Sequence, residues 1–111
     1  MNYEEMSDFE INKEVALLVN NNIVFTDDSF VYLDTDDDSI VDYCSNPSDA
    51  WPIMAENGIA TIPTGRLTVW CAIHNPQIDR NNQIHANILE YGKNPLRAAM
   101  ICFLKMKDVE K

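Results

Sequence analysis

Two stretches that begin with Asn-Pro constrain the fold of this chain more than any other feature: NPSDAWPIMAENG (46–58) and NPLRAAMICFLKM (94–106). An N-cap Asn accepts hydrogen bonds from free backbone N–H groups, and Pro suits the first helical position because it has no N–H to leave unpaired. Gly58 after Asn57 fits a left-handed C-cap. Pro52 lies inside the first stretch and predicts a kink, or a tight first turn followed by a helix that restarts at Pro52. We therefore expect two helices here, with the rest of the chain packed around them.

A further helix and a set of short strands are predicted around these two helices. Ser7 and Glu10 make an S-x-x-E capping box, and apolar residues then recur at helical spacing, so we expect a helix over 8–19. Runs rich in β-forming residues, joined by short turns, predict antiparallel strands. The run 40–44 is either a strand or an irregular approach to the helix that follows. The predicted strands cover residues 23–26, 30–33, 40–44, 59–62, 66–74 and 83–91.

Together these elements predict an α+β fold with an antiparallel β-sheet and three helices packed mainly on one face. The expected order is helix, two or three strands, helix, three strands, helix. With 111 residues the chain is expected to form a single domain, residues 1–111. Its core is predicted from the apolar helical stripes and the alternating strand residues. The predicted core residues are Ile11, Val15, Leu18, Trp51, Met54, Val69, Cys71, Leu96, Met100 and Phe103.

The charge of the chain is strongly negative and unevenly distributed. The formal net charge is −10, and residues 1–65 hold 14 of the 18 acidic residues with one base, Lys13. Residues 66–111 hold 4 acids and 7 bases. Such a surface repels phosphate and attracts basic partners, so we expect an unknown, basic protein partner and no direct binding of nucleic acid. The alternative is an acidic surface that only keeps the protein in solution.

No segment predicts a membrane span or an exported protein. The apolar runs fall short of the roughly eighteen residues that a span requires, and the acidic start MNYEEMSDFE lacks the apolar region of a signal peptide. The three cysteines, Cys44, Cys71 and Cys102, are widely spaced and odd in number, which favours reduced and mostly buried thiols. We therefore expect a cytoplasmic protein.

Three blocks of the sequence are similar to a known family. MNYEEMSDFEINKEVA, DYCSNPSDAWPIMAENGI and NPLRAAMICFLKMK, at this spacing, resemble the NinX family of lambdoid phages and prophages. The resemblance implies a small phage-encoded accessory protein in the cytoplasm of the host bacterial cell. It implies no established activity and carries over no catalytic residues. The distinctive positions are Ser7, Asp8, Asn46, Pro47, Asp49, Ala50, Trp51, Pro52, Asn94, Pro95, Leu96 and Arg97.

The acidic run at residues 34–38 is one candidate site. It resembles half of an EF-hand calcium loop, but Ser39 and Ser45 stand at the sixth and twelfth positions, where that loop needs Gly and Glu. The other interpretations are weak, loose cation binding or a solvated turn between strands. A small metal-dependent hydrolase or nuclease that uses these carboxylates is the enzymatic alternative. The carboxylates of the run are Asp34, Asp36, Asp37 and Asp38.

No catalytic or metal-binding constellation stands out elsewhere. Zinc would need His74 and His85 to meet a cysteine, but Cys71 points to the opposite strand face from His74. No Ser or Cys lies at a spacing that indicates a paired His, and the three glycines form no phosphate-binding loop. We therefore expect no catalytic residues, no metal and no other cofactor.

Trp51 and Arg97 are the best binding candidates, because each lies in the opening turns of an Asn-Pro helix. In one interpretation Trp51 anchors the core on a face shared with Met54, and Arg97 pairs with a nearby carboxylate such as Asp49. In the other, Trp51 and Arg97 line one groove where a partner docks.

These observations predict a non-enzymatic accessory protein that acts through protein–protein contacts. An alternative is a mimic of DNA, in which turn carboxylates gathered on one side present a negative field to a basic protein. The mimic predicts capture that weakens steeply with salt, because salt screens exposed charges. Its carboxylates would be Asp27, Asp28, Asp34, Asp36, Asp37, Asp38 and Asp42.

Overall fold

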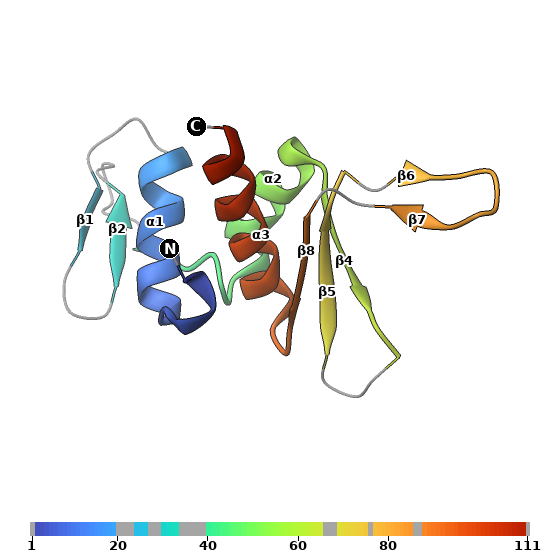
Figure 1. Cartoon of the computed structure of the whole chain (residues 1–111). Coiled ribbons are helices and arrows are strands. Elements are labelled where there is room, and N and C mark those ends of the chain that lie inside the picture. Colours follow the sequence, from blue (N-terminus) through green and yellow to red (C-terminus); the bar gives the residue numbers. More distant parts are fainter. Residues whose placement is uncertain are drawn as a thin grey trace.

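The predicted α+β class is confirmed, because three α-helices alternate with antiparallel strands in the expected order (Figure 1). The computed structural model describes residues 2–19, 24–26, 30–33, 40–65, 69–75, 77–85 and 88–110, and these counts refer to them. The elements are the 3-10 helix η1 (Tyr3–Glu5), α1 (Asp8–Val19), β1 (Val24–Thr26), β2 (Val31–Leu33), β3 (Ile40–Val41), α2 (Pro47–Asn57), β4 (Ile59–Pro63), β5 (Trp70–His74), β6 (Gln77–Ile78), β7 (Ile84–His85), β8 (Ile88–Gly92) and α3 (Pro95–Glu110).

The helices begin and end where local signals predict. At the start of α1 the Glu10 N–H donates to Ser7 Oγ at 3.2 Å, and the Ser7 hydroxyl donates to the Glu10 carboxylate at 3.2 Å. At the start of α2 the Ser48 N–H donates to Asn46 Oδ1 at 3.0 Å. Gly58 closes α2 with a φ of 66°, a left-handed conformation that favours glycine. Caps of this kind contribute about 1 kcal/mol each.

The strands form three antiparallel sheets, where the sequence analysis expected one. Their strand orders are β1-β2-β3, β4-β5-β8 and β6-β7. The run 40–44 satisfies both earlier interpretations in part, since β3 covers its first two residues and a turn follows. The predicted strand 83–91 divides into β7 and β8, and β7 pairs with β6 inside the segment expected to be a polar loop. The start of the predicted strand 66–74 lies outside the described residues.

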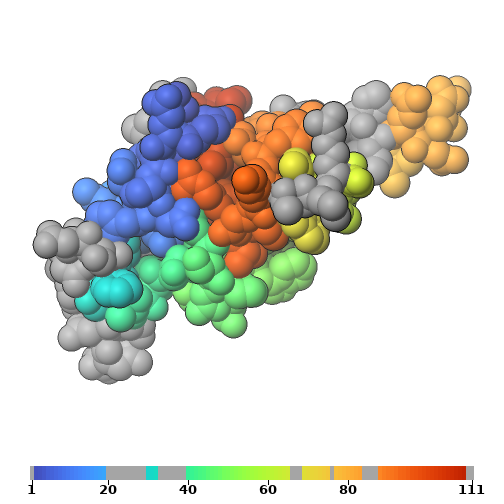
Figure 2. All heavy atoms as spheres, turned by 90° about the horizontal axis from the view of Figure 1, so that it is seen from below, coloured from blue at the N-terminus to red at the C-terminus, as the bar shows by residue number. Residues whose placement is uncertain are grey.

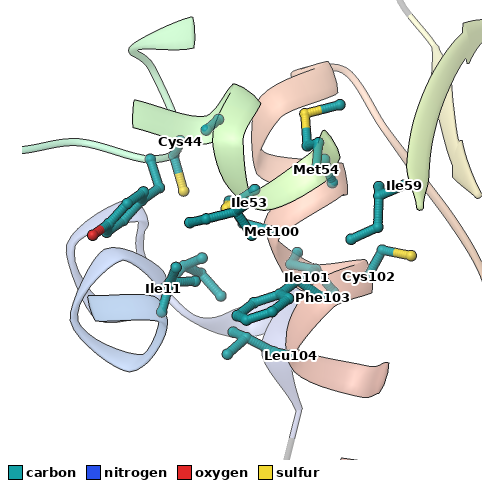
Figure 3. Packing of buried hydrophobic residues seen from close by; sticks show 14 of the residues in the cluster. Ile11, Cys44, Ile53, Met54, Ile59, Met100, Ile101, Cys102, Phe103 and Leu104 are labelled. Carbon is teal, nitrogen blue, oxygen red and sulfur yellow. The ribbon is translucent and has the colours of Figure 1, made fainter. Parts of the chain in front are cut away.

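The core is organised around α3, which is covered on all sides over 98–104, where every residue is buried. Figure 3 shows Ile11 of α1 and Ile53 of α2 directed toward Met100 and Phe103 of α3. On its other side α3 packs against one face of the β4-β5-β8 sheet (Figure 1). Burying one large apolar side chain contributes about 1.5–3 kcal/mol, so α3 supplies much of the stability.

Most of the predicted core is buried, but Leu18 and Trp51 are wrong, with 41% and 63% of their surfaces exposed. Val69 and Leu96 are half-buried. At about 100° per residue, Leu18 lies roughly 90° from the centre of the stripe that α1 buries. That stripe consists of Ile11, Asn12, Val15 and Ala16.

Candidate functional site

Trp51 points out of the protein, so the expectation that it anchors the core is incorrect. The apolar residues of α2 fit two overlapping stripes, one through Trp51, Met54 and Ala55 and one through Ala50, Ile53 and Met54. α2 buries the second stripe, and Ala50 is completely inaccessible. The small side chain of Ala50 allows a close approach to the core, and Trp51, about 100° further round the helix, faces outward.

The support beneath Trp51 is well defined. α2 runs from Pro47 to Asn57 as one helix and continues through Pro52 rather than restarting there. The Asn57 side chain donates to the Ile53 carbonyl at 2.7 Å and strengthens the last turn. On the exposed side of α2 the neighbours of the indole, at spacings of three, one and four residues, are short side chains that cannot cover it. These neighbours are Ser48, Pro52 and Ala55, all exposed.

Asp49, the second predicted binding residue, has a structural role next to this surface. Its Oδ2 accepts a hydrogen bond from the Asp42 N–H at 3.0 Å. Asp42 Oδ1 in turn accepts from the side-chain amide of Asn12 at 2.9 Å, and Asn12 Oδ1 accepts from the Cys44 N–H at 3.0 Å. These bonds fasten the turn that precedes α2 to the buried side of α1, so the position of α2 is fixed relative to the core.

Arg97 does not pair with Asp49 as predicted. Its Nη1 lies 2.7 Å from Oδ1 of Asp8, and its Nη2 donates to the Met6 carbonyl at 2.5 Å. Nη2 also approaches two carbonyls of η1, each at 3.4 Å. The planar guanidinium is suited to several acceptors at once. Arg97 therefore clamps the N-terminal segment onto the start of α3.

A shallow hollow of ≈ 250 Å³ lies beside Arg97, and Trp51 is not among the residues that line it. The structure thus does not bring the two predicted binding residues together in this hollow. Their roles in binding stay predictions. The lining residues are Glu4, Glu90, Tyr91, Gly92, Lys93, Asn94, Arg97, Ala98 and Ile101.

The sequence analysis missed an ion-pair network at the edge of this hollow. Lys105 Nζ lies 2.6 Å from Oε1 of Glu4 and 2.6 Å from Oε2 of Glu90, a carboxylate whose side chain is only 6% exposed. A signal was present, since Glu90 is in phase with Ile88 on the strand face directed at α3. An acid on an inward-facing strand position indicates a cation on the element that covers it.

The charges of this network support one another. Burial alone would lower the pKa of Lys105, but its hydrogen bonds to Glu4 and Glu90 raise that pKa above its ordinary value. The hydrogen bond to Lys105 lowers the pKa of Glu4. The network is therefore charged at neutral pH and fastens the N-terminal segment to α3 and β8, which is a structural task.

The acidic run with Asp34, Asp36, Asp37 and Asp38 lies outside the described residues, as do Asp27 and Asp28. Within the part of the chain that the structure does describe, no three His, Cys, Asp or Glu side chains gather as a metal site would need. Cation binding by the run, the metal-dependent hydrolase and the DNA mimic therefore stay predictions.

The cysteines are buried and unpaired, as predicted. Burial raises the pKa of Cys44 and that of Cys102 to about 12, so neither provides a thiolate nucleophile at neutral pH. The two histidines considered for zinc do not face each other in register. His85 pairs with Gln77, whereas His74 pairs with residues of β4 and β8.

None of the helices in the described ranges has the length and apolar character that crossing a membrane requires.

Comparison with known proteins gives one finding about relationship. A family model described as Bacteriophage P22, NinX matches residues 2–107, nearly the whole chain, in agreement with the resemblance carried by its three sequence blocks. None of the curated proteins compared with the chain matches it.

Proposed function

Because the chain belongs to the NinX family of bacteriophage P22, we propose that it is a phage accessory protein that binds another protein and performs no catalysis itself. The observation that carries this proposal is the exposed indole of Trp51 on the outside of α2. A tryptophan exposed to this degree leaves a large apolar area in water, which a protein partner would remove.

The geometry around Trp51 suits a binding residue. Tryptophan is enriched among the residues that dominate interface energies, because it buries a large area while few rotatable bonds are immobilised. Here the ring stands on a capped helix whose position is fixed by the bonds through Asp49 and Asp42. A rigid support lowers the entropic cost of association. The surface is therefore organised before a partner arrives.

The charges around Trp51 define the chemistry of the partner. From Glu14 to Gly65 the sequence contains no Lys or Arg, so α2 and its flanking segments carry only negative charges. Asp49 and Glu56 belong to α2 itself, and Glu56 is exposed. An arginine can stack on the indole face as a cation–π pair while its charge meets these carboxylates. The proposed partner is a protein with an arginine-containing basic surface.

Affinity capture from phage-infected cells tests the proposal. The full chain should capture a basic protein, and the Trp51→Ala variant should lose it, whereas Trp51→Phe should retain part of the capture. Val109→Ala is the matched control, since Val109 is an exposed apolar residue of α3 with no assigned role. Added salt should weaken the capture, because exposed charges are screened beyond roughly 8–10 Å. Capture that is indifferent to Trp51→Ala contradicts the proposal.

The same experiment separates the two alternatives. A DNA mimic depends on the acidic run, so replacing Asp36, Asp37 and Asp38 with Asn would abolish capture while Trp51→Ala would leave it unchanged. A metal-dependent hydrolase would be stabilised against heat by a divalent cation, since binding to the folded form alone raises the melting temperature. The exposed Trp51 favours the protein-binding function over both.

A further inference from the structure

One face of the β4-β5-β8 sheet is apolar and is not covered by α3. Opposed residues of an antiparallel pair share a face, and the strand registers place six residues together. We call this set the outer sheet face, and no charged residue belongs to it. Its members are Ala60, Ile62, Cys71, Ile73, Leu89 and Tyr91.

The helices occupy the opposite face. Ile59 and Ala72, which alternate with the outer residues, belong to the core cluster, and Glu90 meets Lys105 of α3. On the outer sheet face the central Cys71 and Ile73 are buried by their neighbours, as the sequence predicts, but the flanking residues are open. Ile62, Leu89 and Tyr91 are exposed by 40%, 50% and 61%. In the part of the chain that is described, every helix lies on the other side of this sheet (Figure 1).

We infer that a second copy of this chain packs against the outer sheet face, giving a two-fold symmetric dimer. In such a dimer the same patch serves both partners, so an uncharged patch meets an uncharged patch without leaving a charge unpaired. Leu89 and Tyr91 of one copy contact the equivalent region of the other. A hydroxyl-bearing aromatic such as Tyr91 suits the rim of an interface, where its polar end stays wet.

The distribution of charge favours a second copy over a basic partner at this face. Fourteen of the 18 acids belong to residues 1–65, and the described elements that carry most of them, η1, α1 and α2, lie on the far side of the sheet from the outer face (Figure 1). Two copies that meet through the outer sheet face keep these acidic parts apart. A basic partner would find no carboxylate on this face to pair with.

The amount of exposed surface is consistent with a dimer. The chain exposes 7154 Å², whereas a compact monomer of this length exposes about 6,200 Å². The surplus of roughly 900 Å² is of the size that one partner buries in a standard interface, about 800 Å². The extents of 50 × 29 × 26 Å describe the same elongation.

The β6–β7 hairpin supplies a second contact for the partner. It projects beyond the body of the protein in both views, and Ile78 at its end is 72% exposed (Figures 1 and 2). The turn is well formed, since the Asp79 carboxylate accepts from the N–H groups of Asn81 and Gln83 at 2.8 and 2.9 Å. An isolated two-stranded hairpin is nevertheless marginal in water and gains stability when it packs on something else. In the dimer this arm reaches over the partner.

Sedimentation equilibrium of the full chain over a range of concentrations tests the inference. The wild type should have the mass of two copies. Leu89→Asp should weaken dimerisation more than about 100-fold, since it places like charges across the symmetric interface. Ile78→Asp at the arm should weaken it by about tenfold. Val109→Asp, an equally drastic change at an exposed site outside the interface, should leave the dimer intact. Circular dichroism verifies that each variant is folded.

Two results overturn the inference: a wild type that stays monomeric at every concentration, or a folded Leu89→Asp variant that dimerises like the wild type. A monomer that captures a different protein through the outer sheet face also overturns it. The outcome is independent of the proposed function, because Trp51→Ala should remain dimeric. Loss of capture without loss of the dimer therefore contradicts only the function, and a monomer that retains Trp51-dependent capture contradicts only the dimer.

Discussion

The side-chain amide of Asn94 donates a hydrogen bond to the backbone carbonyl of Cys44, 50 residues earlier in the chain, with 2.6 Å between nitrogen and oxygen. The same side chain caps α3, because its Oδ1 accepts from the N–H groups of Leu96 and Arg97 at 2.9 and 3.2 Å. One residue thus starts α3 and joins it to the turn that leads into α2. The two Asn-Pro helices are connected through a single amide.

Replacing Asn94 should be more harmful than replacing Asn46, although both are helix caps. Asn94→Ala removes the cap and the bond to Cys44, which we expect to cost about 2–3 kcal/mol. Asn46→Ala removes a cap alone and should cost about 1 kcal/mol. Asn94→Asp keeps the capping oxygen but replaces the donor to Cys44, so it should fall between the two extremes. Urea unfolding measures all three, and equal losses for the two Ala variants would refute the connecting role.

Arg97 should hold the N-terminal segment in place. Arg97→Ala removes the ion pair with Asp8 and the bonds to backbone carbonyls of residues 3–6, and should lower the unfolding free energy by about 1–3 kcal/mol. Asp8→Asn removes only an exposed charge and should cost under about 1 kcal/mol. Hydrogen exchange should show faster exchange of residues 2–6 in Arg97→Ala. Protection as slow as in the wild type would mean that η1 is held by other contacts.

Stability should fall as the pH rises above 9. Burial raises the pKa of Cys44 and of Cys102 from 9.0 to about 12. The unfolded chain therefore releases these protons first, and each thiol lowers the unfolding free energy by about 1.4 kcal/mol per pH unit above its unfolded pKa. Urea unfolding between neutral pH and about pH 10 measures this slope. Cys102→Ala should reduce the slope whatever its effect on absolute stability, and a flat profile would show that the thiols are not shielded.

Trp51 should contribute little to stability. Its side chain is mostly in water, so Trp51→Ala should change the unfolding free energy by no more than about 0.5 kcal/mol. Trp70, the other tryptophan, is half-buried. A soluble quencher should therefore reach part of the wild-type fluorescence easily, and Trp51→Ala should remove that part. A large loss of stability, or quenching that does not change, would place Trp51 in the core after all.

The helices were predictable from sequence because their signals are local. Ser7, Asn46 and Asn94 cap the helices that follow them, and Gly58 closes α2 as its sequence indicates. The antiparallel pairing followed from the short turns. The division into three sheets did not, since it depends on which strands end at a turn and which continue, a matter of packing that no local pattern encodes.

The candidate site was predicted in its residues but only partly in their roles. Trp51 and Ala50 both satisfy helical periodicity, and a sequence cannot decide which of two overlapping stripes a neighbour covers. The partner of Arg97 is Asp8, separated from it by 89 positions in sequence, so local spacing pointed to the wrong carboxylate. Glu90 was overlooked although its phase in the strand placed it on the inner face. Long-range contacts decided each of these points.

The most direct test of the proposed function is photocrosslinking from position 51 in phage-infected cells. A photoreactive phenylalanine analogue replaces Trp51 in the full chain, and a second form carries the analogue at Val109 as a control for exposure. We predict that position 51 yields an adduct with a basic protein, identified by mass spectrometry, and that position 109 does not. Absence of an adduct from position 51, or the same adducts from both positions, would contradict a partner surface at Trp51.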